Sequence, residues 1–156
     1  MEEVRTQAKA AVGLDILWKA LTKELRFVVP KAIPNLVKDV EMIEGDGGLG
    51  SVLLFNFCSD ASPMTYQREK IVELEESLHQ IALEVIEGGH LNHGFSSYKT
   101  TFMLTAIGEQ ETLVDIKVSY QFDQKDDRIT KMPLKTTDST LYFIKCLETY
   151  LLNADS

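Results

Sequence analysis

Hydrophobic spacing at the start of the chain predicts one strand followed by two short helices. The segment Val4–Ala11 is short and stops before Gly13, which favours a strand. An apolar residue then recurs at i, i+3, i+4 and i+7, the stripe of an amphipathic helix, at Leu14, Leu17, Trp18 and Leu21. Pro30 and Pro34 limit the next segment, Leu25–Leu36, to at most a short helical piece, because proline removes a donor and clashes with the preceding turn.

The hydrophobic period changes to two from Val37 to about Tyr120, which is typical of strands with one buried face. Glycine, proline and polar residues that favour turns interrupt this region repeatedly. The candidate strands are Val40–Glu44, Ser51–Phe57, Tyr66–Leu74, His79–Glu87, Ser97–Leu104 and Leu113–Phe122. Their short connections favour antiparallel pairing, because a parallel pair needs a crossover of about a dozen residues or more.

The end of the chain returns to helical spacing. The segment that begins at Pro133 has a stripe of Thr140, Ile144, Leu147 and Leu151, with Phe143 beside it. Pro133 suits a helix start and Asn153 a helix end. The element order predicts an α+β fold, in which a strongly curved seven-stranded antiparallel sheet wraps around a long C-terminal helix. No linker or repeat divides residues 1–156, so we expect a single domain.

Alternation along Tyr66–Leu74 places Gln67, Glu69 and Ile71 on the buried face. Burying an unpaired carboxylate costs several kcal/mol, so Glu69 needs a partner, a raised pKa or a wet cavity. Thr140 is the one polar residue on the apolar stripe of the last helix. Together with Gln67 and Glu69 it would give the few convergent polar groups of a small-molecule site. The alternative is a bulge that shifts the register and sends Glu69 to solvent.

Composition indicates a folded, intracellular protein. The 156 residues are 44% hydrophobic and 26% charged, which argues against disorder. Sixteen basic and 24 acidic residues give a net charge of −8, which disfavours nucleic acid and anionic membranes as partners. No apolar run reaches the ~18 residues of a membrane helix, and the N-terminus lacks the features of a secretory signal. We therefore expect a cytoplasmic protein in which Cys58 and Cys146 stay reduced.

Several short motifs resemble those of the plant pathogenesis-related class-ten proteins, the family of the birch pollen allergen. These motifs are the glycine-rich loop Glu44–Ser51 and the segments Val28–Lys31, Ile33–Pro34, Ile86–Gly89 and Ser97–Thr100. The resemblance covers essentially the whole chain, and the order of elements agrees. Three further segments are similar to the phytohormone-binding, or cytokinin-specific binding, branch: Tyr66–Glu69, Tyr98–Phe102 and Ser139–Leu141.

This resemblance implies a helix-grip fold with a large internal cavity that holds a small hormone, without a cofactor. A purine cytokinin such as trans-zeatin is expected first and a gibberellin second. The polar contacts of the branch carry over to Gln67, Glu69 and Thr140, and to the backbone carbonyl of Leu21. Strand and helix periodicity single out the first three of these residues independently.

Other predicted ligand contacts differ in character from these polar positions. His90 stands where the branch commonly has tyrosine, and we expect it to add a hydrogen bond that changes with pH. Three aromatic residues are expected in the wall of the cavity, with a place in the plain core as the alternative for the two phenylalanines: Tyr98, Phe102 and Phe143.

An enzyme of the same fold is the alternative function. Norcoclaurine synthases use this cavity for a condensation that needs Tyr, Glu, Lys and Asp. The corresponding positions here are Tyr66, Arg68, Gln80 and Lys99, so the acid–base set is missing. Ribonuclease activity, proposed for the wider family, is disfavoured by the net charge of −8 and by the lack of a histidine pair beside a basic cluster. We predict a binding or storage protein with no catalytic residues.

Two sequence patterns could be taken as sites for a phosphate or a metal ion. The loop Glu44–Ser51 lacks the Gly-Lys-Ser/Thr ending of a phosphate-binding loop, so a hairpin turn with positive φ is favoured. His90 and His93 have no third ligand nearby, which favours a hydrogen-bonded surface pair over a metal site. A sodium or calcium ion on the carbonyls of Pro30–Lys38 stays open. We expect a small hormone as partner, no nucleic acid or membrane, and a monomer or weak homodimer.

Overall fold

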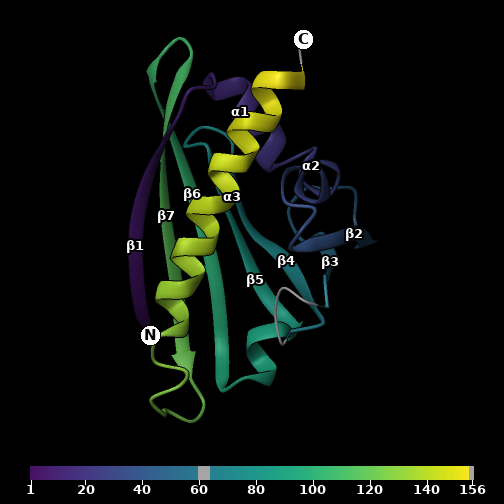
Figure 1. Ribbon diagram of the computed structural model, residues 1–156, viewed down its shortest axis with the longest axis vertical. Helices are drawn as coiled ribbons and strands as arrows, with labels where there is room; N and C mark the ends of the chain where they lie inside the picture. The colour runs from purple at the N-terminus through teal and green to yellow at the C-terminus, as the bar shows by residue number, and fades with distance from the viewer. Residues whose placement is uncertain (60–63, 155–156) are drawn as a thin grey trace.

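The structure is a computed structural model that describes residues 1–59 and 64–154, and its elements follow the predicted order (Figure 1). Its strands are β1 (Glu2–Ala10), β2 (Val37–Glu44), β3 (Val52–Phe57), β4 (Tyr66–Glu75), β5 (Gln80–Gly88), β6 (Phe95–Gly108) and β7 (Glu111–Phe122). Its helices are α1 (Leu14–Leu21), α2 (Leu25–Ala32) and α3 (Met132–Ala154), with a short 3-10 helix, η1 (Gly89–Asn92), after β5.

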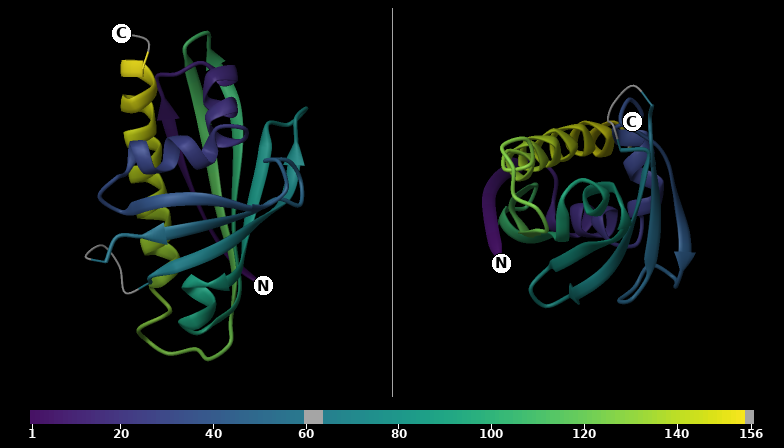
Figure 2. Two further views of the ribbon diagram at one scale, coloured as in Figure 1. Left: turned by 90° about the vertical axis from the view of Figure 1, so that its right-hand side faces the viewer. Right: turned by 90° about the horizontal axis from the view of Figure 1, so that it is seen from below.

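All the strands belong to one seven-stranded sheet in the order β1-β7-β6-β5-β4-β3-β2. Every neighbouring pair is antiparallel, from β1 with β7 to β2 with β3. The helices α1 and α2 carry the chain from one edge strand, β1, to the other, β2. The sheet curves around α3, as the view from below shows (Figure 2). The predicted α+β fold with a helix gripped by seven antiparallel strands is confirmed.

The core fills the space between α3, the two short helices and the concave face of the sheet. Val114 and Ile116 on β7 and Ile144 and Leu147 on α3 have at most 1% of their surface exposed. Leu17 of α1 belongs to the same buried cluster. Full burial of such a side chain stabilises the fold by roughly 1.5–3 kcal/mol. The apolar stripes predicted for α1 and α3 are therefore the faces that hold the elements together.

Several elements extend beyond their predicted bounds. The strand β2 begins at Val37 and not at Val40, because Val37 already pairs with Phe57 before an irregularity in the ladder. The strand β6 runs over Phe95–Gly108, longer at both ends than expected, because its pairing with β7 continues to both termini. Pro30 lies inside the last turn of α2, and the short helix ends at Ala32, as expected from the proline.

The glycine-rich loop between β2 and β3 is a turn that satisfies its own backbone donors. Gly45 and Gly47 have φ angles of +86° and +105°, which glycine adopts without a steric penalty. The N–H of Gly47 donates to Ser51 Oγ at 2.9 Å, and the N–H of Gly48 donates to Asp46 Oδ1 at 3.1 Å. Because these amides already have acceptors, the geometry supports the hairpin interpretation over a phosphate cradle.

Both cysteines of the chain are free thiols. Cys58 and Cys146 are half-buried, and neither forms a disulfide. Within the residues that the structure describes, no helix is both long and apolar enough to cross a membrane.

Candidate functional site

A cavity of about 560 Å³, partly open to solvent, lies inside the curve of the sheet between α2, α3 and the strands β3 to β6, and we call it the internal cavity. Its volume falls in the roughly 300–1,000 Å³ range of small-molecule pockets. Its wall is mostly apolar and includes Val29, Phe55, Leu83, Phe102 and Phe143. The polar groups of its wall come from β4, η1, β6 and α3, and they include Gln67, Glu69, His90, Tyr98, Thr136 and Thr140. All the residues predicted for the site except Leu21 line this one cavity.

Gln67 and Glu69 both face the cavity because the alternation of β4 is intact between them. The pairing of β4 with β5 does contain a register shift here, since Arg68 pairs with Glu87 but Glu69 pairs with Val85. The extra residue, Ile86, therefore lies on β5, where it is 45% exposed. A bulge on β4 between Gln67 and Glu69 would have turned Glu69 to solvent. The irregularity beside Glu69 lies on β5, and the extra residue of β4 itself, Val72, comes after Glu69 and leaves its direction unchanged.

Glu69 is a carboxyl group without a cation beside it. Burial raises the pKa of Glu69 from its ordinary value of 4.5 to about 7, against a smaller opposing effect of the hydrogen bond from Gln67. That bond joins Gln67 Nε2 to Glu69 Oε2 at 3.2 Å. Across residues 1–59 and 64–154, no basic side chain forms an ion pair with Glu69. The part of Glu69 that is not covered by protein lines the cavity, so a ligand can reach it.

The side chain of Gln67 is held in a notch that only glycine leaves open. A Cβ on Gly89 would lie 2.1 Å from Gln67 Oε1 and 2.7 Å from Gln67 Cβ. Gly89 also has a φ of +49°, in the left-handed region that disfavours side chains. Gln67 Oε1 is buried and has no hydrogen-bond partner among the described residues. Gly89 therefore leaves the space in which the amide of Gln67 lies beside Glu69.

His90 adds a second polar group to the wall and stacks on an aromatic neighbour. Its ring lies parallel to that of Tyr98, with centroids 3.6 Å apart. Its Nε2 is 3.4 Å from Thr136 Oγ1, which also contacts the hydroxyl of Tyr98. Because the hydroxyl of Thr136 donates to the carbonyl of Met132 at 3.1 Å, Thr136 Oγ1 acts as the acceptor for both neighbours. His90 Nδ1 is then the unprotonated nitrogen, and it has no partner in the described part of the chain.

The environment of His90 does not support the pH-dependent hydrogen bond that we expected. Burial, and to a smaller extent the charge of His93, lowers the pKa of His90 to about 4. The imidazole therefore stays neutral from pH 5 upward. In this cavity the group that titrates near neutrality is Glu69, because burial favours the uncharged form of a histidine and the protonated form of a carboxyl group.

Thr140 lies on the cavity wall, but its hydroxyl hydrogen is already engaged in a hydrogen bond within α3. Its Oγ1 donates to the carbonyl of Thr136, one helical turn earlier, at 2.7 Å. The remaining lone pairs of Thr140 can only accept, so it suits a ligand N–H or O–H and not a carbonyl.

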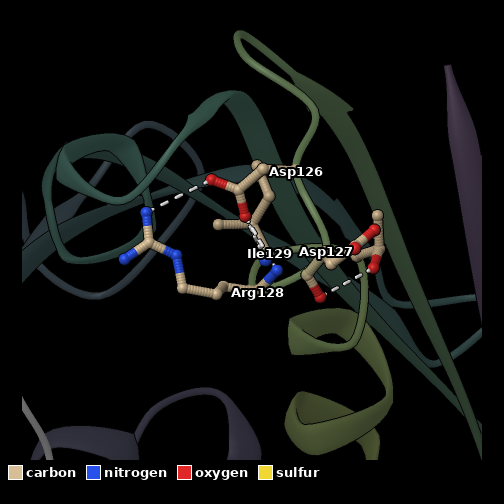
Figure 3. A network of polar contacts seen from close by, with 5 residues as sticks. Asp126, Asp127, Arg128 and Ile129 are labelled. Carbon is tan, nitrogen blue, oxygen red and sulfur yellow. Dashed lines mark hydrogen bonds and ion pairs between the residues drawn. The ribbon is translucent and has the colours of Figure 1, made fainter.

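The turn before α3 fixes the start of the helix that carries Thr136 and Thr140 (Figure 3). Asp126 Oδ1 accepts hydrogen bonds from the backbone N–H groups of Arg128 at 2.7 Å and Ile129 at 3.3 Å. The first of these bonds is the main reason why the pKa of Asp126 is lowered. Ile129 is buried in a cluster of side chains from β5, β6 and β7. The polar residues of α3 are thus placed by an anchored helix start.

The remaining predicted residues divide between wall and core. Phe102 and Phe143 line the cavity and also belong to the main hydrophobic cluster. Leu21 is 1% exposed at the end of α1 and does not line the cavity, so this structure brings it into no contact with the site. Trp18 likewise belongs to the core, where its Nε1 donates to Glu76 Oε2 at 2.6 Å.

Sequence reasoning missed three polar residues on the wall, namely Lys135, Thr136 and Ser139. Thr136 lies four residues before Thr140, so the helical period that selected Thr140 could have found it. Lys135 and Ser139 flank the apolar stripe, and nothing in their spacing distinguishes them from solvent-facing residues. Within the described residues, no three His, Cys, Asp or Glu side chains are close enough to share a metal ion.

The chain is similar to proteins of more than one function. It is 26% identical to norbelladine synthase of Narcissus pseudonarcissus over 96% of its length and 91% of that protein. It is also 26% identical to pathogenesis-related protein B of Petroselinum crispum, covering 97% of both chains. The structure of norcoclaurine synthase from Thalictrum flavum superposes with a TM-score of 0.82 at 22% identity, over 97% of this chain and 87% of that one. A model of the pathogenesis-related protein Bet v 1 family matches residues 1–154, and the chain therefore belongs to that family.

Proposed function

We propose that the protein binds and stores a small plant hormone in this cavity without transforming it, with a purine cytokinin first and a gibberellin second. The observation that carries the proposal is the Gln67–Glu69 pair on a mostly apolar wall. Most of the affinity would come from buried apolar surface, at ~25 cal/mol per Å². The polar pair would set the orientation of the ligand.

The donors and acceptors of the cavity fit a cytokinin. An ionised Glu69 accepts an N–H of an adenine-type ring, and Thr140 can accept a second donor. A protonated Glu69 donates instead, and would pair with the carboxylate of a gibberellin. Because the pKa of Glu69 is about 7, both forms are available at neutral pH. This is the physical reason for keeping the gibberellin as the second ligand.

The alternative that the protein is an enzyme is supported by the names of similar proteins, but little by the residues that line the cavity. Two of the similar proteins are named as synthases. The positions that the resemblance assigns to synthase chemistry are Tyr66, Arg68, Gln80 and Lys99, and none of them lines the cavity. Arg68 instead pairs with Glu87 at 3.0 Å, and Lys99 with Glu73 at 3.7 Å. The basic side chains at two of these positions are thus paired with acidic residues.

Calorimetric titration of trans-zeatin and of gibberellic acid tests the proposal. We expect both to bind the wild type, and Glu69→Gln and Thr140→Val each to weaken the preferred ligand by roughly 1–3 kcal/mol, because buried polar groups of the ligand lose their partners. Glu84→Gln is the matched control, since it removes a carboxylate of β5 that does not line the cavity.

Equal affinities for the wild type and both cavity variants would remove Glu69 and Thr140 from the site. Failure of either hormone to bind would refute the proposal itself. Incubation with dopamine and hydroxybenzaldehyde, and separately with RNA, tests the alternatives. Turnover that is lost in Glu69→Gln would assign the cavity to an enzyme.

A further inference from the structure

A second cavity, of about 430 Å³, lies on the opposite, outer face of the sheet. It is lined by residues of β1, β5, β6 and β7 and shares none of its lining with the internal cavity. Alternation separates the two, because Thr100 and Phe102 point to the internal cavity whereas Thr101 and Met103 line the outer one. Nothing in the proposed hormone binding uses this outer cavity.

Two cations face each other across adjacent strands in the outer cavity. Arg5 of β1 and Lys117 of β7 are direct partners in the ladder, and Thr101 of β6 is the partner of Lys117 on its other side. Like charges directly opposite each other destabilise a sheet. Arg5 Nε is paired with Glu3 Oε2 at 2.6 Å. Lys117 forms no ion pair within the described residues, and the nearest carboxylate that lines the same cavity is that of Asp115.

The hydroxyl of Thr101 is a buried polar group without a partner. Thr101 is only 5% exposed, and its Oγ1 makes no hydrogen bond within the described parts of the chain. Such a hydroxyl costs stability unless something else satisfies it. Flexible side chains, Lys117 and Met103, line the same cavity, so Thr101 can be uncovered without backbone movement. Thr101 therefore offers a donor beside Lys117, on the side of that lysine away from Arg5.

The neighbouring acidic and amide groups are already engaged. Asp115 Oδ1 accepts a hydrogen bond from Gln7 Nε2 at 2.6 Å, and Gln80 Nε2 donates to Glu73 Oε2 at 3.3 Å. The free groups of the cavity are thus an ammonium, the outer nitrogens of a guanidinium and a hydroxyl. Three donors from three strands, two of them charged, match the several acceptor oxygens of a phosphate group.

We propose that the outer cavity binds a phosphate group, free or carried as a monoester by a small molecule, through Lys117, Arg5 and Thr101. The ligand would relieve the repulsion between the two cations and satisfy the buried hydroxyl. The site is independent of the internal cavity, so a ligand at one leaves the other accessible.

Nitrogen-15 NMR titration of the full chain with inorganic phosphate, at constant ionic strength in chloride, tests the site. We expect saturable shifts confined to amides near residues 5–7, 101–103 and 115–117. Lys117→Gln should weaken binding at least tenfold and Thr101→Val severalfold. Lys70→Gln is the matched control, because Lys70 is a lysine of the same sheet that is exposed and lines neither cavity. Shifts that do not saturate, or that weaken equally in Lys70→Gln, would overturn the proposal.

Two further measurements separate a binding role of Thr101 from a structural one. Without phosphate, the melting temperature of Thr101→Val should equal or exceed that of the wild type, because the variant buries no unpaired hydroxyl. The phosphate-dependent rise in melting temperature should shrink in the variant, and an unchanged rise would remove Thr101 from the site. Tighter binding of glycerol 3-phosphate than of inorganic phosphate would identify a monoester as the ligand, and equal binding would identify free phosphate.

Discussion

The two ends of α3 have opposite surroundings. At its core end, Ile144 and Leu147 are at most 1% exposed and belong to the same main cluster as Leu17 and Ile81. At its cavity end, residues from Met132 to Phe143 line about 560 Å³ of space. One helix thus has a solid half and a hollow half.

The same contrast holds for polar groups. Near the core end, the Nε1 of Trp18 and the hydroxyl of Thr112 have hydrogen-bond partners at 2.6 and 2.7 Å. Near the cavity end, Gln67 Oε1 and His90 Nδ1 have none among the described residues. Buried groups without partners are rare in a region that only has to be stable. The comparison indicates that the core end stabilises the fold and the cavity end is kept for a ligand.

The largest expected effect separates the two ends by stability. Leu147→Ala should lower the free energy of unfolding by about 2–5 kcal/mol, because a fully enclosed side chain leaves a void behind. Leu83→Ala on the cavity wall should cost less, since one side of Leu83 already lacks packing partners. Urea unfolding of both variants measures the difference. Equal losses would mean that the cavity wall is as tightly packed as the core.

A second expected effect is that removing the buried carboxylate of Glu69 raises the free energy of unfolding at alkaline pH. Below pH 4.5 the carboxyl of Glu69 is protonated in the folded and the unfolded protein, so its ionisation does not lower the free energy of unfolding. As the pH rises towards 7 the unfolded chain ionises first, and the wild type loses stability until the folded pKa of about 7 is passed. Glu69→Gln should therefore be more stable than the wild type by roughly 1–3 kcal/mol at pH 8.

Urea unfolding at pH 4 and at pH 8 checks this difference, with Glu84→Gln as the control for loss of an acidic side chain outside the cavity. A Glu69→Gln variant that is no more stable than the wild type at pH 8 would mean that Glu69 is well solvated.

The glycine pair allows backbone strain to be separated from ligand positioning. Gly88→Ala and Gly89→Ala each place a side chain at positive φ, so both should lose about 1–2 kcal/mol of stability or more. Only at Gly89 does the new Cβ meet Gln67, whereas at Gly88 it meets Tyr66. Hormone affinity, measured on the folded protein, should fall in Gly89→Ala and not in Gly88→Ala. A loss of equal size in both would assign the effect to the backbone.

The smallest expected effect identifies the ligand by its pH dependence. If an ionised Glu69 accepts an N–H of trans-zeatin, affinity should rise between pH 6 and pH 8 by no more than about tenfold, or 1.4 kcal/mol. Gibberellic acid should show the opposite trend, because its carboxylate needs the protonated form. Glu69→Gln should abolish both trends in calorimetric titrations, and a slope that persists in this variant would point to another titrating group.

Strand alternation predicted the cavity face of β4 correctly, because no extra residue interrupts β4 between Gln67 and Ile71. It could not decide where the bulge lies. The extra residue beside Glu69 is Ile86, on β5, and a second extra residue, Val72, lies on β4 after Glu69. The sequence pattern of β4 shows neither position. The placement of Glu69 followed from the pattern, but the alternative could be rejected only from the paired register.

The finer polar geometry was out of reach of the sequence. The stacking of His90 on Tyr98 depends on η1, a short 3-10 helix that was expected only as a break between strands. Burial in this position, with a smaller effect of the charge of His93, lowers the pKa of His90 and removes its expected pH response. Similarly, the sequence identified Thr140 but not its bond to the carbonyl of Thr136, which decides that it accepts and does not donate.

The uneven packing of α3 has a consequence for the rate at which a ligand enters and leaves. Regions with few buried contacts open locally without unfolding the whole chain. The turns of α3 that line the cavity can therefore separate locally from the sheet, while Ile129 before the helix and Ile144 and Leu147 within it stay in place. The residence time of a bound ligand should then correlate with the hydrogen-exchange rates of the amides of residues 132–143. Mutations that stabilise the packing around Ile144 and Leu147 should leave the residence time unchanged.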